Sequence, residues 1–143
     1  MKWSKMNVKK HINDILLKNG VIIDPFNQKS FKGSIWVKDG RIAGVGDFDI
    51  PKMDDICIID CTNKIITQGF CDLHAHFREP GEDDKEDLGS GSRSALAGGF
   101  TRVCVMPNTK PPIDSPELVD FIIQTAKQSP VHIHPIGAVT RNQ

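Results

Sequence analysis

The sequence has no net charge and no long apolar run, and each absence removes a class of partner. Its 18 basic and 18 acidic side chains cancel, so electrostatics give no reason to expect binding to nucleic acid or to an anionic membrane. No segment approaches the roughly 20 apolar residues of a membrane span. The start is basic like that of a signal peptide, but the apolar stretch 15–17 is too short for a signal-peptide core. Cytoplasm is therefore the expected location.

Two common site motifs are also missing. The four cysteines, at positions 57, 61, 71 and 104, show no Cys-x-x-Cys spacing and lie mostly in apolar, strand-like runs. Buried, reduced thiols are expected in place of a zinc knot or disulfides, which fits a reducing compartment. The glycine-rich run 89–91 lacks the lysine pattern of a phosphate-binding loop, which disfavours a nucleotide site.

The most informative feature that is present is a pair of histidines separated by one residue. They lie in Asp72-Leu-His-Ala-His-Phe-Arg-Glu-Pro-Gly81, after the apolar run 65–71, which predicts a buried strand. Side chains on a strand alternate between its faces, so His74 and His76 are expected to point the same way and to bind one metal ion. Asp72 has the same parity one step deeper, where it would support these ligands or the fold more than bind metal itself.

The neighbouring residues favour a metal site over a chance pair of histidines, which occurs in many strands. Arg78 follows at once and, with Pro80 and Gly81, predicts a rigid turn that holds a cation beside the metal. A second predicted strand, 103–106, ends in Pro-Asn-Thr, with Asn108 at its carboxyl end. Imidazoles suit zinc, which can make water nucleophilic near neutral pH and polarise a carbonyl.

Other polar groups in the chain favour simpler interpretations. His132 and His134 repeat the spacing but lie at the start of their predicted strand, whereas α/β barrels hold ligands at the carboxyl ends of strands. Glu79 and the acidic run 82–84 are expected to be solvated loop charges and not acid–base groups.

Residues 1–62 are predicted to form part of a small β-sandwich. Asn19-Gly20 and Asp39-Gly40 each lie between two short apolar runs, and both dipeptides suit two-residue hairpin turns with positive φ. The expected strands are 15–18, 21–24, 35–38, 41–45 and 56–60.

From residue 63 the pattern changes to alternating strands and helices, which is typical of parallel βα units. The expected strands are about 65–75, 101–106 and 131–138, and the expected helices are about 85–97 and 115–128, the second capped by Ser115. Residues 63–143 are thus expected to form βα units of a parallel sheet.

Three segments resemble the amino-terminal part of a dihydroorotase, in the cyclic amidohydrolase superfamily. They are DLHAHFREPG, KEDLGSGSRSALAGGFT and VCVMPNTKPPID, and the resemblance runs from about residue 12 to residue 140. It implies that residues 63–143 are the first βα units of an incomplete TIM-like (β/α)8 metallo-hydrolase barrel, truncated after about three strands, since such a barrel needs about 250 residues. It also implies a zinc enzyme, with two ions in the complete protein, in which His74 and His76 are metal ligands. It also implies that Arg78 and Asn108 bind the substrate's carboxylate. The remaining ligands and the general base are expected beyond Gln143, and the bridging ligand is either Asp or a carbamylated Lys.

The resulting hypothesis is a dihydroorotase that reversibly hydrolyses dihydroorotate to N-carbamoyl-aspartate in pyrimidine biosynthesis, with a homodimer as the candidate assembly. Two alternatives stay open: another cyclic amidohydrolase of the allantoinase or hydantoinase type, and a non-catalytic scaffold that binds a transcarbamoylase. A scaffold would need none of the four site residues, which argues against the second. The isolated 143-residue chain is expected to be poorly folded or aggregated, and inactive.

Overall fold

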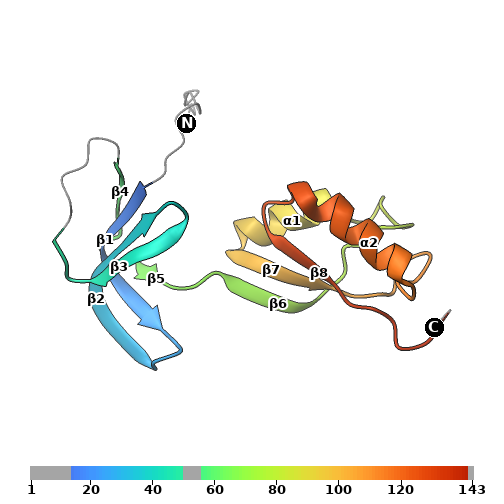
Figure 1. Cartoon of the computed structure of the whole chain (residues 1–143), viewed down its shortest axis with the longest axis horizontal. Helices are drawn as coiled ribbons and strands as arrows, with labels where there is room; N and C mark the ends of the chain where they lie inside the picture. The colour runs from blue at the N-terminus through green and yellow to red at the C-terminus, as the bar shows by residue number, and fades with distance from the viewer. Residues whose placement is uncertain (1–13, 50–55, 142–143) are drawn as a thin grey trace. The chain divides into compact units, whose positions relative to one another are not determined.

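The computed structural model describes residues 14–49 and 56–141, which belong to two compact units that divide between Gln68 and Gly69 (Figure 1). Both units contain β-sheet, and only the second contains helices among the described residues. No helix in the described ranges is long and apolar enough to cross a membrane.

The first unit is a mixed β-sheet with strand order β3-β2-β1-β4, in which β5 also pairs with β1. β1 is antiparallel to β2, β2 is antiparallel to β3, and β4 and β5 run parallel to β1. A small core of Ile22, Cys61 and Ile66 packs against it. The strands are β1 (Asp14–Asp24), β2 (Lys29–Lys38), β3 (Arg41–Gly46), β4 (Ile56–Asp60) and β5 (Ile65–Ile66).

One of the two predicted hairpins is confirmed and the other is wrong. Asp39 and Gly40 join β2 to β3 with φ values of +48° and +72°. The chain does not reverse at Asn19, because β1 continues through it with a shift in its pairing to β2 between Leu17 and Gly20. Gly20 is needed there for another reason: a Cβ on it would lie 2.4 Å from Cδ1 of Ile66.

The predicted strand 65–75 is also divided in two. Ile65 and Ile66 pair with Val21 and Ile22 of β1 and thus complete the first sheet, while the next strand begins at Phe70. Ile66 is 7% exposed, so burial in the first core outweighs continuation of the apolar run into the second unit.

The second unit has the alternating strands and helices that the sequence predicts. Its three strands are parallel in the order β6-β7-β8. Residues of both helices share one core with the strands, including Leu88, Ile122, Val103 and Ile133. The elements are β6 (Phe70–Ala75), α1 (Leu88–Ala97), β7 (Phe100–Val105), α2 (Pro116–Thr125), a 3-10 turn (Ala126–Gln128) and β8 (His132–Pro135).

The two helices begin differently. Asp87 caps α1 by accepting a hydrogen bond from the backbone N–H of Ser90 at 2.6 Å, as one half of a capping box. Ser115 is the residue before α2, as predicted, but its side chain makes no capping hydrogen bond. A proline at the first helical position starts α2 instead, since its fixed φ suits a helix and it has no N–H to satisfy.

Candidate functional site

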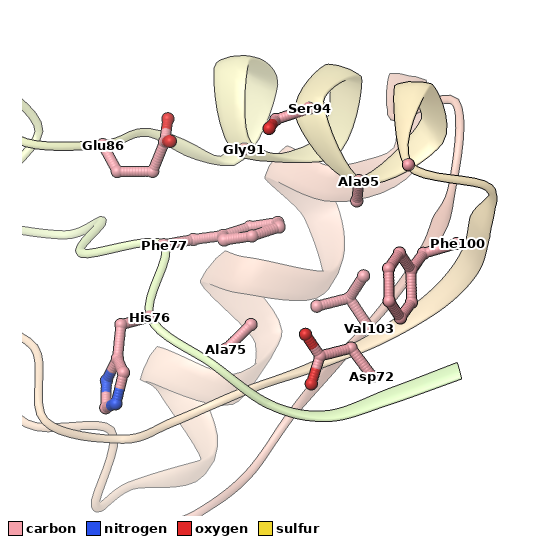
Figure 2. Close-up of a pocket in the computed structure, with 11 residues that line it drawn as sticks. Asp72, Ala75, His76, Phe77, Glu86, Gly91, Ser94, Ala95, Phe100 and Val103 are labelled. Carbon is pink, nitrogen blue, oxygen red and sulfur yellow. The ribbon is translucent and has the colours of Figure 1, made fainter. Parts of the chain in front are cut away.

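An irregularity in β6 sets the direction of the histidine side chains. Three residue steps separate Asp72 from Ala75, whereas only two separate their partners Val103 and Val105 on β7. Because of this extra residue, the Asp72 and Ala75 side chains both lie on the side of the helices, and the His76 ring extends to the other side of the chain (Figure 2). The expectation that Asp72 shares the face of the histidines is therefore wrong.

Asp72 instead contacts the histidine segment through the backbone. Its Oδ1 accepts a hydrogen bond from the backbone N–H of His74 at 2.9 Å. Asp72 also lines a cavity of about 260 Å³ between β6 and α1, with Gly91, Ser94 and Phe100 among the other lining residues (Figure 2). This carboxylate fixes the local conformation of β6 on the side away from the His76 ring.

The structure brings His74 and His76 together at the end of β6. Their ring centroids are 5.1 Å apart and the ring planes meet edge to face at 69°. Both side chains are exposed in the described part of the chain. Two imidazoles this close, at positions 74 and 76 of the chain, can bind one ion or two adjacent ions.

Asn108 reaches the same place from the next strand. Its Oδ1 lies 2.8 Å from Nδ1 of His76, although the two residues are 32 positions apart in the chain. An amide oxygen can only accept, so this contact is a hydrogen bond in the tautomer whose Nδ1 carries the proton. In the neutral ring, the lone pair is then on Nε2, which is the form that a metal ion needs.

Arg78 lies in the loop that follows β6, two residues after His76. It has a φ of +62°, and its guanidinium Nη1 is 3.9 Å from Oε2 of Glu82. Its side chain is 33% exposed, so the charge is available to a ligand. A planar guanidinium can bind a carboxylate through two parallel hydrogen bonds.

Two acidic residues of this loop, Glu79 and Glu82, have specific partners, which the sequence did not reveal. Leu88 is the first residue of α1, and its backbone N–H donates a hydrogen bond to Oε2 of Glu79 at 2.8 Å. Glu82 contacts Lys85 at 2.5 Å and Lys110 at 3.1 Å. Hydrogen bonds from Lys85 and then Lys110 lower the pKa of Glu82 to about 2. Neither carboxylate is an isolated loop charge.

The donors on the described residues fit a metal only in part. No group of three or more His, Cys, Asp or Glu side chains that could hold a metal is present in 14–49 or 56–141. The two imidazoles, one with its tautomer set by Asn108, are half of a four-coordinate site. β8 is shorter than the predicted strand 131–138 and has four residues, so His132 lies at its start, as expected, but His134 is its third residue and does not.

Known proteins resemble this chain over most of its length. Residues 63–143 match a family model described as "Dihydro-orotase-like". The chain is 43% identical to a "Dihydroorotase" from Caldicellulosiruptor saccharolyticus over 128 residues, which are 89% of the chain and 30% of that protein. It is also 43% identical to a "Dihydroorotase" from Solibacter usitatus over 129 residues, 89% of the chain and 29% of that protein. The chain thus spans less than a third of the length of these relatives.

Solved structures show the same fold. An L-hydantoinase from Arthrobacter aurescens superposes with a TM-score of 0.70 at 24% identity, over 87% of this chain and 27% of that one. A D-hydantoinase from Thermus sp. gives a TM-score of 0.64 at 25% identity, with the same two coverages. The mixed α/β fold therefore resembles a part of these enzymes.

Proposed function

The chain belongs to the dihydroorotase-like family, and from this premise we propose that the complete protein hydrolyses the cyclic amide of dihydroorotate reversibly to N-carbamoyl-aspartate in pyrimidine biosynthesis. The contact between His76 and Asn108 carries the proposal, because it joins the histidine pair on β6 to an amide at the end of β7. The carboxyl ends of two neighbouring parallel strands then form one site, as in α/β barrels.

The proposed architecture follows from the same relationship. The parallel strands β6 to β8 with their helices are the first units of a TIM-like (β/α)8 barrel, and the first unit is part of a β-sandwich. Neither edge strand of this short sheet, β6 or β8, has a second partner among the described residues. Barrel closure would remove both edges. We place the complete protein in the cytoplasm, with a homodimer as the expected assembly.

His74 and His76 are the proposed zinc ligands, with two ions expected in the complete protein. When bound, zinc supplies a Lewis acid that makes water nucleophilic near neutral pH and polarises the amide carbonyl. The residues of this chain hold the imidazoles in place: Asn108 fixes the ring of His76, and Asp72 fixes the backbone N–H of His74.

Arg78 and Asn108 are the proposed groups for the substrate's carboxylate. Arg78 offers a charged two-pronged donor, and Asn108 retains its NH2 group for a ligand while its oxygen contacts His76. Together they would orient the ring so that the scissile amide faces the histidines, which lowers the entropic part of the barrier. Two alternatives to a dihydroorotase remain: an enzyme of the hydantoinase or allantoinase type, and a non-catalytic scaffold that binds a transcarbamoylase.

Zinc analysis and kinetics of the complete protein test these assignments. His74→Ala and His76→Ala should each lose zinc and activity together, whereas the control His132→Ala should keep both. Arg78→Ala should keep zinc but lower kcat/KM for dihydroorotate by about 100-fold or more, because it removes a charge-assisted contact. Unchanged zinc content in both histidine variants would contradict the metal site. Turnover of hydantoin or allantoin with none of dihydroorotate would favour the alternative enzymes, and no turnover of any of them would favour the scaffold.

A further inference from the structure

The loop after β6 and the loop after β7 are joined by one acidic residue that the proposed reaction does not use. We propose that Glu82 is a positioning residue: it holds these two loops together so that Arg78 and Asn108 can bind the same carboxylate. This inference rests on the proposed function, and it adds a role for a residue that lies outside the histidine site.

Glu82 contacts cations of both loops. Oε1 contacts Nζ of Lys85 at 2.5 Å and Nζ of Lys110 at 3.1 Å, and Lys110 lies two residues after Asn108. Oε2 faces Nη1 of Arg78 at 3.9 Å. That last distance is too long for a hydrogen bond, so Glu82 attracts the guanidinium without occupying its donors.

The backbones of the two loops also touch beside Glu82. The N–H of Lys110 donates to the carbonyl of Pro80 at 2.9 Å. Gly81 lies against the carbonyl of Lys110 so closely that a Cβ on Gly81 would be 1.9 Å from that oxygen. The ion pairs of Glu82 therefore reinforce a contact at which the chains are already as close as backbones can be.

Two contacts with α1 hold the first of these loops on either side of Arg78. Phe77 is buried against Gly91 of α1, where a Cβ would come within 2.7 Å of the ring. Glu79 accepts the first N–H of α1. Arg78 lies between these two residues, so its backbone is held, and the ion pairs of Glu82 add to the backbone contact between Lys110 and Pro80 that positions the loop after β7, with Asn108, beside it.

A positioning role predicts an effect on substrate binding and little effect on the chemical step. Hydrogen bonds from the two lysines keep the pKa of Glu82 near 2, so the carboxylate is charged in any neutral assay. Glu82→Gln keeps the shape of the side chain and removes the charge that attracts three cations. Each exposed ion pair is weak, and the loss of the set should raise KM for dihydroorotate roughly 3- to 10-fold. kcat should change by less than about twofold, since the metal ligands are untouched.

The matched control is Asp84→Asn in the complete protein. Asp84 lies in the same loop, is exposed, and takes part in none of the ion pairs of Glu82, so this change removes the same formal charge without those contacts. A second measurement follows hydrogen exchange at the N–H of Lys110, which should be about fivefold faster in Glu82→Gln and unchanged in Asp84→Asn.

The outcomes separate this inference from the proposed function. Wild-type protein with no turnover of dihydroorotate would contradict the proposed function, and exchange at Lys110 would then still decide whether Glu82 joins the loops. If the wild type is active, an equal KM in the two variants, or a lower kcat with unchanged KM in Glu82→Gln, overturns the positioning role. Unchanged exchange at Lys110 in Glu82→Gln overturns it as well.

Discussion

Gly81 is the position at which a single methyl group should do the most damage to the site. Its φ is +98°, a backbone angle that residues with a side chain rarely adopt. A Cβ on Gly81 would lie 1.9 Å from the carbonyl oxygen of Lys110 and 2.7 Å from the Cβ of Lys110. Neither of these Lys110 atoms can move unless the loop after β7 moves with it. Gly81→Ala must therefore separate the loop after β6 from the loop after β7.

The expected loss of stability has two parts. A non-glycine residue at positive φ costs about 1–2 kcal/mol. Separation of the loops also removes the hydrogen bond from Lys110 to Pro80, worth about 0.5–1.5 kcal/mol. Together with imperfect repacking, Gly81→Ala should lower the free energy of unfolding by about 2–4 kcal/mol.

Gly99→Ala isolates the first part. Gly99 lies in the same unit at a φ of +83°, but its nearest neighbour is the ring of Phe70 at 3.6 Å, an ordinary contact. This variant should lose only the backbone contribution, about 1–2 kcal/mol. Urea unfolding of the complete protein measures both. Equal losses in the two variants would refute the argument that the loops touch at Gly81.

Three other predictions concern charge, the amide and the core. The folded pKa of Glu82, about 2, is below its usual 4.5, so its contribution to stability is present above about pH 4.5 and is lost as the pH falls towards 2. Urea unfolding of wild type and Glu82→Gln should converge over that range, and a constant difference would contradict the ion pairs. Asn108→Asp keeps an acceptor for His76 but opposes the substrate's charge, so kcat/KM should fall about 100-fold or more with zinc retained; zinc loss would show a different role. Ile113→Ala removes a fully buried side chain and should lower the free energy of unfolding, measured by thermal unfolding, by about 2–5 kcal/mol. A smaller loss would mean that neighbouring side chains fill the cavity that the substitution leaves.

Local patterns predicted the order of elements in the second unit, because its strands and helices follow short-range rules. The sequence also predicted parallel βα units with Asn108 at the carboxyl end of a strand, and Asn108 contacts His76 from the end of β7. Asp39-Gly40 forms its turn since nothing in the tertiary structure competes with it; a Cβ on Gly40 would have no neighbour within 4 Å.

The predictions failed where distant residues decide. Asn19-Gly20 has the chemistry of a hairpin turn, yet Gly20 is packed against Ile66, 46 positions away, and β1 continues. Glu82 looked like a solvated charge because Lys110, 28 positions away, cannot be seen from the loop sequence. The prediction that Asp72 lies on the same face as the histidines was wrong because a period-two pattern does not show where a strand contains an extra residue.

That extra residue in β6 makes the chain tolerant of deletion at one point and intolerant at the next. If Leu73 were lost, the pairing with β7 would become regular, and both His74 and His76 would be kept, with Asn108 still beside His76. Loss of the next residue, His74, would also make the pairing regular but would remove a proposed zinc ligand. When homologous sequences are aligned, a gap at Leu73 should therefore be compatible with an intact site, whereas a gap at His74 should not.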